Sequence, residues 1–348
     1  MKIALTQYSK GSGCGCKIAP AVLSEILAQH SVGVSTPKLL VGNDTKDDAA
    51  VYQIDETNAF ISTTDFFLPI VDDPFQFGQI AAANAISDVY AMGGNPLFAL
   101  AVLGWPIDTI PVSAAQEVMA GARSVCAEAG IVMAGGHSID SKDPIFGLVV
   151  NGMVAIENLK RNNGAVVGDI LLLTKPLGVG ILATAQKKEL IEAADLELLV
   201  KQLTTLNKVG AAIGKVKGVH AMTDVTGFGI LGHLIEMMEG SGLGATIHYN
   251  QLPILEAARK YIAQKAIPDA TYRNWNAYNQ QVAFGTGVNV MEAFQILPDP
   301  QTNGGLLIAV APDALEEVQT ILKQAGIENT TPIGVCTEAA EKRIQVNA

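Results

Sequence analysis

The sequence predicts an α/β protein with about two domains, and three observations support this. Its 348 residues are nearly half apolar (49%), enough for two buried cores, because a domain takes roughly 150 residues. Aromatic residues make up only 5%, while 34 glycines supply turns and close backbone contacts, a mixture that suits α/β packing. Strand-like and helix-like segments alternate along the chain, with a polar interruption at 157–168.

Each predicted element follows from a local pattern. The first 40 residues form a mobile, glycine-punctuated arm followed by one helix, at 20–29. In the next region, 41–157, we expect strands at 49–54, 59–64, 97–103, 132–134 and 146–154 and helices at 77–92 and 114–129. Gly93-Gly94 suits the C-cap of the first of these helices. Beyond the interruption, 168–348 should form an α+β domain with strands at 169–174, 219–223 and 306–310 and a helix at 227–238.

Charge and composition exclude several classes of function. The net charge of −11, from 34 acidic and 23 basic residues, would repel nucleic acid and anionic membranes, so neither is an expected partner. The N-terminus turns polar too early for a signal peptide, and no apolar run approaches the ~20 residues that span a bilayer. Four cysteines, two of them separated by one glycine, do not form a disulfide framework. We therefore expect a soluble protein of the reducing cytoplasm.

The first candidate for chemistry is Gly-Ser-Gly-Cys-Gly-Cys-Lys at 11–17. Its three glycines predict a mobile loop that can close over a site, and the Lys17 ammonium favours the thiolate of a neighbouring cysteine. Two other interpretations stay open: a surface turn with incidental cysteines, or half of a zinc site, although zinc usually takes four ligands. Cys126 and Cys336 are predicted to be small core residues.

The second candidate is a set of aspartates at the ends of predicted elements: Asp47, Asp48, Asp65, Asp88 and Asp224. Carboxylates at element ends can converge on one cleft, and magnesium binds such oxygens together with substrate phosphates. Asp88 falls in the last turn of its helix, where the macrodipole disfavours a negative charge, and Asn84 lies on the same face. The alternative is that each aspartate is a cap or part of a solvated turn.

Two glycine-containing segments are weaker candidates. The segment at 224–229, Asp-Val-Thr-Gly-Phe-Gly, lies between a strand and a helix and could present free backbone N–H groups to an anion. The segment at 135–140, Gly-Gly-His-Ser-Ile-Asp, is predicted to be a loop whose histidine is more often structural than catalytic. No P-loop pattern is present, so any bound ATP would need another fold.

Together these segments resemble the selenophosphate synthetases (selenide, water dikinases), from Leu5 to about Gly334. The resemblance rests on Leu-Thr-Gln-Tyr-Ser at 5–9, Gly-Cys-Gly-Cys-Lys at 13–17, Leu-Val-Gly-Asn-Asp-Thr-Lys-Asp-Asp-Ala-Ala-Val at 40–51, Thr-Thr-Asp-Phe-Phe at 63–67, Asn-Ala-Ile-Ser-Asp at 84–88, Ala-Met-Gly-Gly at 91–94, Gly-Gly-His-Ser-Ile at 135–139, Leu-Thr-Lys-Pro-Leu-Gly at 173–178, Thr-Asp-Val-Thr-Gly-Phe-Gly at 223–229 and Asp-Pro-Gln-Thr-Asn-Gly-Gly at 299–305. The Cys-Gly-Cys-Lys arm distinguishes this family within a wider superfamily of ATP-using enzymes.

The resemblance implies a two-domain, aminoimidazole ribonucleotide synthetase-like fold. The N-terminal sheet domain would bind ATP and Mg²⁺ and form a barrel in a homodimer, followed by the C-terminal α+β domain. The implied reaction is ATP + selenide + water → selenophosphate + AMP + phosphate, which supplies activated selenium for selenocysteine and selenouridine synthesis. A selenium-delivery protein is a further possible partner.

The resemblance also assigns roles to individual residues. The reactive chalcogen position falls on Cys14 and the essential lysine on Lys17. The implied Mg²⁺ ligands are Asp48, Asp88 and Asp224. The implied nucleotide contacts are Lys17, Thr45, Lys46, Asp47, Asp65 and Asp88, with Gly136, His137 and Ser138 reaching the nucleotide of the other subunit. One departure is Asn303, where relatives often carry serine; it lies outside these contacts, and we expect no consequence.

Overall fold

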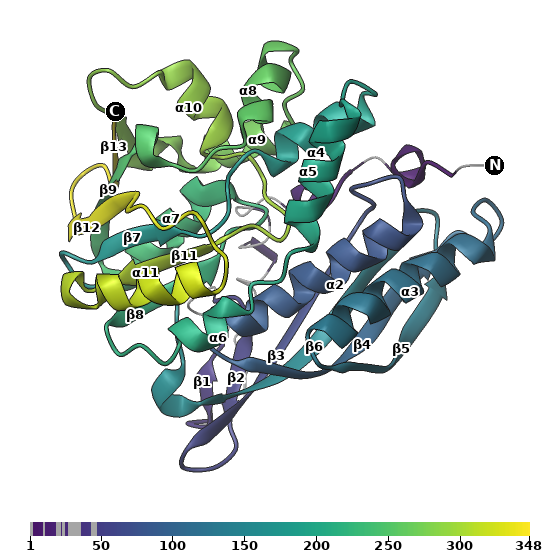
Figure 1. The fold of residues 1–348 in the computed structure, drawn as a ribbon, viewed down its shortest axis with the longest axis horizontal. Helices are drawn as coiled ribbons and strands as arrows, with labels where there is room; N and C mark the ends of the chain where they lie inside the picture. Colours follow the sequence, from purple (N-terminus) through teal and green to yellow (C-terminus); the bar gives the residue numbers. More distant parts are fainter. Residues whose placement is uncertain (1–2, 10, 19–21, 23–24, 27–35, 43–46) are drawn as a thin grey trace.

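The computed structural model describes residues 3–9, 11–18, 22, 25–26, 36–42 and 47–348. It contains two sheets, each with its own helices, and residues 3–9 and 11–18 of the N-terminal arm lie between them (Figure 1). The predicted helix at 20–29 falls largely outside the described residues, as do Thr45 and Lys46. Within the described part of the chain, no helix is both long and apolar enough to cross a bilayer.

The first sheet has the strand order β1-β2-β3-β6-β4-β5. β4 and β5 are parallel, and the other neighbours are antiparallel. The helices α2 and α3 cover one face of this sheet (Figure 1). Inward residues alternate along β3, and its last one, Phe67, packs against Phe77 of α2 with ring centroids 6.0 Å apart. The strands are β1 Leu39–Val41, β2 Ala50–Gln53, β3 Asn58–Phe67, β4 Asn95–Trp105, β5 Val132–Asp140 and β6 Ile145–Ala155, and the helices are α2 Pro74–Ala91 and α3 Val112–Glu128.

Helix α2 is the element that connects the two halves of the molecule. Asp73 caps its N-terminus by accepting a hydrogen bond from the Gln76 N–H at 2.9 Å, and Pro74 begins the helix. Gly93, with a φ of 74°, follows its C-terminus, which confirms the predicted glycine cap. α2 is buried almost all round because the first sheet and α3 pack on one side and the second domain on the other. Polar side chains on α2 are therefore held inside the protein.

The second sheet has the order β10-β13-β9-β12-β7-β11-β8. In its inner strand β11, alternate residues face opposite layers: Leu306 and Ile308 pack with α11, and Leu307 packs in the core that includes α7. The strands are β7 Ile170–Leu173, β8 Val219–Asp224, β9 Leu243–His248, β10 Val282–Phe284, β11 Leu306–Val310, β12 Gly334–Glu338 and β13 Ile344–Asn347. The helices are α4 Val179–Lys187, α5 Ala193–Thr204, α6 Val209–Ile213, α7 Gly229–Ser241, α8 Glu256–Ala263, α9 Asp269–Tyr278, α10 Val290–Ile296 and α11 Leu315–Gln324.

Two local predictions were wrong. The segment 135–140 is not a loop: it continues β5, which stays paired with β4 from Gly135 opposite Leu100 to Asp140 opposite Trp105. Asp65 does not end its strand, because β3 continues to Phe67 and pairs with β6 throughout. In both cases, pairing with a neighbouring strand satisfies the backbone of residues whose side chains had suggested a turn.

Candidate active site

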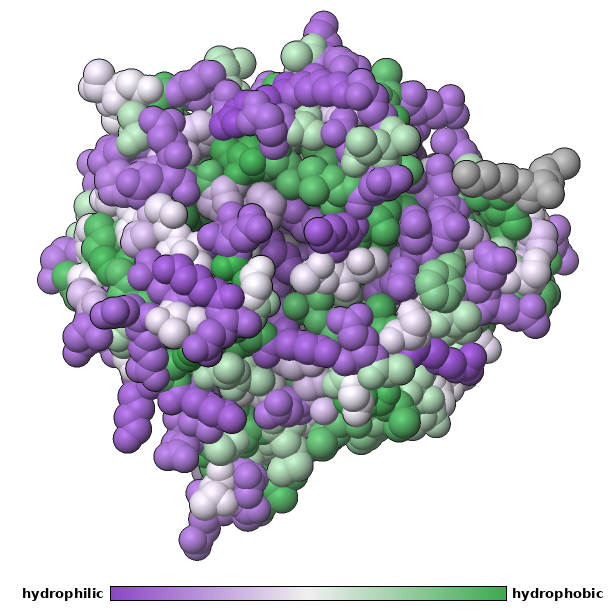
Figure 2. Space-filling view, in the orientation of Figure 1, coloured by the Kyte–Doolittle hydropathy of each residue, from purple (hydrophilic) through white to green (hydrophobic). Residues whose placement is uncertain are grey.

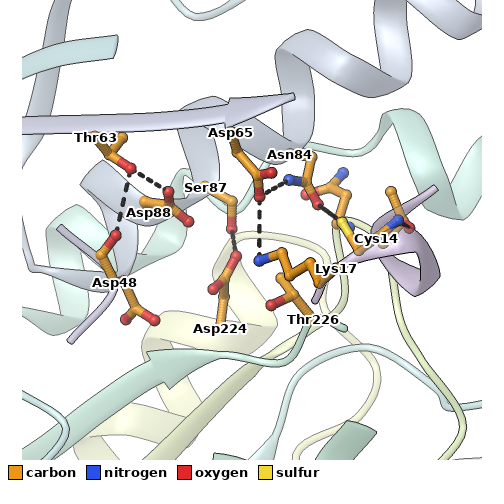
Figure 3. Close-up of polar contacts among 12 residues, drawn as sticks. Cys14, Lys17, Asp48, Thr63, Asp65, Asn84, Ser87, Asp88, Asp224 and Thr226 are labelled. Atoms are coloured by element: carbon orange, nitrogen blue, oxygen red, sulfur yellow. Dashed lines mark hydrogen bonds and ion pairs between the residues drawn. The ribbon is translucent and has the colours of Figure 1, made fainter. Parts of the chain in front are cut away.

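Four aspartates from four different elements meet where the two domains pack together (Figure 3). Asp48 lies just before β2, Asp65 is on β3, Asp88 is in the last turn of α2, and Asp224 ends β8. The last three are at most 9% exposed. The structure therefore brings together the three predicted metal ligands, Asp48, Asp88 and Asp224, with Asp65 beside them.

A hydroxyl group supports each of the three predicted metal ligands. The Thr63 hydroxyl donates to Asp88 Oδ2 at 2.5 Å, the Ser87 hydroxyl to Asp224 Oδ2 at 2.5 Å, and the Thr223 hydroxyl to Asp48 Oδ1 at 2.7 Å. These bonds fix one oxygen of each carboxylate. The other oxygen of Asp48, Oδ2, is buried without a hydrogen-bond partner among the described residues.

The carboxylates also repel one another. Burial, followed by the charges of its neighbours, raises the pKa of Asp48 and of Asp88 well above the ordinary value. Burial likewise raises the pKa of Asp224 to about 6, although the hydrogen bond from Ser87 and the charge of Lys17 act in the opposite direction. A bound cation would relieve this repulsion and give Asp48 Oδ2 a partner.

The cluster is not a complete metal centre by itself. No group of three or more His, Cys, Asp or Glu side chains among the described residues has the spacing to hold a metal ion. Mg²⁺ keeps several waters and is usually bound by one or two carboxylates plus substrate phosphates. The orphaned oxygen and the crowded charges fit a cation whose remaining ligands come from a nucleotide and water.

The arm closes the other end of the site. Gly13 pairs with Leu68, and the Cys14 N–H donates to the Thr302 hydroxyl at 3.0 Å. These contacts bury Cys14, which is 1% exposed, and its Sγ lies 3.4 Å from Asn84 Oδ1 on α2. Cys14, the candidate reactive thiol, is therefore not in a surface turn. This excludes one of the interpretations that the sequence left open.

Lys17 connects the thiol to the carboxylates. Its Nζ lies 3.6 Å from Asp65 Oδ2, which also accepts a hydrogen bond from Asn84 Nδ2 at 2.7 Å (Figure 3). Burial alone would lower the pKa of Lys17, but the charges of Asp65 and its neighbours raise it above the ordinary value. Lys17 therefore stays protonated, and 39% of its side-chain surface is still exposed to an incoming ligand.

The turn between β8 and α7 differs from its predicted role as an open anion site. The Thr226 N–H is not available, because it donates to His233 Nε2 at 3.0 Å. Burial, followed by the charge of Lys17, lowers the pKa of His233 to about 3, so this histidine is a neutral acceptor. Gly227 lies directly against the arm: a Cβ there would be 2.7 Å from the Cys14 carbonyl oxygen.

Two residues of the site were missed by sequence reasoning. The Asn303 N–H donates to Asn84 Oδ1 at 2.7 Å, so Asn303 supports the amide that contacts Cys14. It is fully buried and has a φ of 45°, a conformation that asparagine tolerates. Lys175 is buried beside it and donates to the carbonyl oxygens of Asn303 and Thr205 at 2.9 and 2.7 Å. Burial lowers the pKa of Lys175 to about 7, against the charge of Asp224.

A signal for both residues was present in the sequence. Asn303 and Lys175 fall inside two of the motifs that carried the resemblance, 299–305 and 173–178. No role is predicted for Asn303 from the sequence, because it is small and polar and lies outside the contacts that the resemblance implies.

Among the remaining predicted nucleotide contacts that the structure describes, Asp47 adjoins the cluster, because its charge adds to the burial and the other charges that raise the pKa of Asp48, whereas Gly136, His137 and Ser138 lie apart from it. Asp47 Oδ1 accepts a hydrogen bond from the Asn162 N–H at 2.7 Å, in the connection between the domains. Gly136, His137 and Ser138 are exposed on β5, at the edge of the first sheet. Within one described chain they contact none of the four aspartates.

Comparisons with known proteins agree with this architecture. The model of the AIR synthase related protein N-terminal domain matches residues 46–154, and that of the C-terminal domain matches residues 166–347. The chain is similar to the selenide, water dikinase of Pseudomonas putida, at 51% identity over 99% of this chain and 98% of the relative. It is similar to the one of Yersinia pseudotuberculosis at 53% identity, over 98% and 97%.

Solved structures share the fold at low identity. Thiamine-monophosphate kinase from Stenotrophomonas maltophilia matches with a TM-score of 0.66 and 18% identity, over 95% of this chain and 96% of that chain. The hydrogenase maturation protein HypE in complex with ATP matches with a TM-score of 0.66 and 17% identity, over 99% and 95%. The two-domain fold is therefore the AIR synthase-like fold expected from the sequence.

Proposed function

The chain belongs to the selenide, water dikinase family, and we propose that the cluster from Asp48 to Cys14 is its active site. The reaction converts ATP, selenide and water into selenophosphate, AMP and phosphate. One observation carries the assignment of the site: a buried thiol and a charged lysine lie next to crowded carboxylates that need a cation. A phosphate-bearing substrate and a chalcogenide thus have adjacent places in one closed site.

The carboxylates Asp48, Asp88 and Asp224 would hold Mg²⁺. The ion would neutralise the triphosphate and spread the charge that develops during phosphoryl transfer. The hydroxyl groups of Thr63, Ser87 and Thr223 already orient these carboxylates, so little reorganisation accompanies binding.

Lys17 would contact the nucleotide as well as the thiol. Lys17 remains protonated, and part of its side chain is exposed. Its Nζ lies beside Asp65 and therefore close to the other carboxylates of the cluster. We assign the other nucleotide contacts to Thr45, Lys46, Asp47, Asp65 and Asp88. The charge of Lys17 would help to hold a phosphate group within reach of Cys14.

Cys14 would orient selenide for attack on the γ-phosphoryl group. A selenium–phosphorus bond forms while the bond from the γ-phosphorus to the bridging oxygen breaks. The electron pair stays on that oxygen of the departing ADP. The closed arm keeps water out of this step, because Cys14 is buried. Water then cleaves the remaining anhydride, which gives AMP and phosphate.

We also propose a homodimer formed through the first sheet. β5 is an edge strand with exposed residues along its length, including Val132 and Ile139 at 65% and 59% exposure. On the face away from α2, Tyr52 and Phe66 are 44% and 49% exposed, and Figure 2 shows hydrophobic residues gathered in the lower part of the molecule, over this sheet. If the first sheets of two chains closed into a barrel, the exposed edge strand and the exposed apolar face would both be covered. Gly136, His137 and Ser138 would then reach the nucleotide of the partner. Light scattering should give twice the chain mass.

Phosphorus NMR tests the function directly. With ATP, Mg²⁺ and selenide under anaerobic conditions, the protein should form selenophosphate, AMP and phosphate in equal amounts. ATP consumption without a selenophosphate signal would reject the function. The selenium-delivery protein and the cytoplasmic location stay predictions from the sequence.

A further inference from the structure

A small cavity lies beside Cys14, between the arm, the β8–α7 turn and α9. Its volume is about 10 Å³, which is room for about one particle the size of a water molecule. The arm contributes Cys14, Gly15 and Lys17 to its wall, the β8–α7 turn contributes Gly227, and α9 contributes Arg273 and Asn274. A cavity of this size can hold a single heavy atom together with its bound protons, and it excludes a nucleotide.

The wall formed by α9 is firmly attached to the rest of the domain. Asn274 Nδ2 donates to the carbonyl oxygens of Gly227 and Pro298 at 2.8 and 2.9 Å, and Asn274 is only 4% exposed. These bonds join α9 to the turn that touches the Cys14 carbonyl. The cavity is therefore bounded on this side by a fixed helix and on the other by the arm.

Arg273 brings a positive charge to the mouth of the cavity. Its Nη2 donates to the Gly15 carbonyl oxygen at 2.8 Å, between Cys14 and Lys17 in the sequence of the arm. A guanidinium group has five N–H donors, so others are left for a ligand. Among the described residues, no carboxylate lies within ion-pair distance of Arg273. Lys17 also lines the cavity, so two cations border the space beside the thiol.

The opposite approach to Cys14 is unfavourable for an anion. It leads over Asp48, Asp88 and Asp224, where the proposed function places the nucleotide, so the bound triphosphate lies on that path during turnover. A charged wall of one sign lowers the local concentration of ligands of the same sign. An anion that must reach the γ-phosphoryl group therefore meets less electrostatic repulsion when it arrives from the α9 side.

We propose that the cavity beside α9 admits and binds the selenide anion, and that Arg273 is the residue that attracts it to Cys14. This inference rests on the proposed function and adds to it a separate route for the second substrate. The nucleotide enters over the carboxylates, and the chalcogenide enters between the arm and α9.

Steady-state kinetics test the role of Arg273. Arg273→Gln removes the charge and keeps a polar, though shorter, side chain. We expect the KM for selenide to rise about fivefold or more, with the KM for ATP and kcat within twofold of the parent. Arg273→Lys should recover most of the loss. The matched control is Arg123→Gln on the surface of α3, which makes the same change in net charge away from the cavity. An unchanged KM for selenide, or an equal rise in the KM for ATP, would overturn the proposal.

Thiol labelling gives a second test that needs no turnover. Iodoacetate is an anion and iodoacetamide is neutral, and both need the same opening of the arm to reach Cys14. The ratio of their alkylation rates at Cys14, followed by peptide mass spectrometry, should fall several-fold in Arg273→Gln and stay constant in Arg123→Gln. A constant ratio in Arg273→Gln would reject the route even if the enzyme makes selenophosphate. A protein that makes none would reject the proposed function, whatever the ratio.

Discussion

The two ends of the site are built in different ways. At the carboxylate end, Asp65, Asp88 and Asp224 lie on β3, α2 and β8, which are packed into the protein core. At the thiol end, Cys14 lies on the arm, which is attached through the buried side chains of Leu5 and Cys14 and through individual polar contacts. These include Thr302, Arg273, and Lys187, whose Nζ donates to the carbonyl oxygens of Ser9 and Gly11 at 2.8 and 3.2 Å.

This difference separates a fixed end from one that can open. The contacts of Arg273 and Lys187 with the arm can be exchanged for water at a net cost of only about 1 kcal/mol each, so the arm near Cys14 should open more readily than the carboxylate end. The carboxylates cannot move apart to relieve their repulsion, because their elements are buried. The carboxylate end therefore depends on a cation, and the thiol end depends on the closed position of the arm.

The largest effect is expected from a change at the carboxylate end. Asp88→Asn should lower kcat at least about 1000-fold, because it removes a predicted Mg²⁺ ligand where charge develops in the transition state. Its thermal stability without Mg²⁺ should stay the same or rise, because a buried carboxylate with a raised pKa is replaced by a neutral group. Phosphorus NMR measures the products, and calorimetry measures Tm. Asp313→Asn, on the surface before α11, is the control. Normal ATP turnover with Mg²⁺ in Asp88→Asn would disprove the metal role.

A change at the thiol end should separate the two functions of the site. Cys14→Ser should lower selenophosphate formation at least about 100-fold, because the smaller and less polarisable hydroxyl cannot replace the thiol in orienting selenide. Binding of Mg-ATP should be nearly unchanged, because the carboxylates and Lys17 are still in place. A thermal-shift titration with Mg-ATP gives the second measurement. Undiminished product with selenide would reject the role of the thiol, and lost nucleotide binding would show that the two ends are not separable.

Sequence reasoning succeeded where side-chain periodicity reflects packing. The positions of α2, α3, β6 and β11 follow from buried apolar stripes and from the glycines after α2, and the structure agrees with them. The convergence of Asp48, Asp88 and Asp224 was predictable for the same reason, since each lies at or near the end of such an element.

Contacts made by isolated polar groups could not be predicted in this way. The bonds from Asn303 to Asn84 and from Asn274 to Gly227 join positions 219 and 47 residues apart in the sequence, and no periodic pattern encodes them. The extension of β5 through Gly135-Gly136 depends on the neighbouring strand β4, whereas the glycines by themselves favour a turn.

Asn303 tests how the missed contacts support the thiol end. Its Nδ2 donates to the carbonyl oxygens of Leu203 and Thr205 at 2.7 and 2.9 Å, and Asn303→Asp would replace both donor hydrogens by a charged acceptor. We expect the free energy of unfolding to fall by about 3–5 kcal/mol, because the new carboxylate is buried and faces two carbonyl oxygens. Chemical denaturation measures this change. Asn289→Asp, at the exposed N-cap of α10, is the control, because a carboxylate can accept the same bond from Glu292. Equal effects of the two substitutions would show that Asn303 is not a buried support of the site.

The smallest expected effect is a dependence of the free energy of unfolding on pH, which Mg²⁺ should weaken. Because burial raises the folded-state pKa of Asp224 from 3.8 to about 6, the folded protein binds more protons than the unfolded chain between these values. The contribution of Asp224 to stability is therefore fully present below pH 3.8 and is lost as the pH rises through about 6, a change of about 3 kcal/mol. Urea denaturation in EDTA should show this loss between pH 4.5 and 6.5, relative to Asp224→Asn, in which this contribution is absent. Saturating Mg-ATP should reduce the difference, since a cation at the carboxylates favours their ionised form. An identical pH profile for the parent and Asp224→Asn would mean that the repulsion at the carboxylate end is already relieved without a cation.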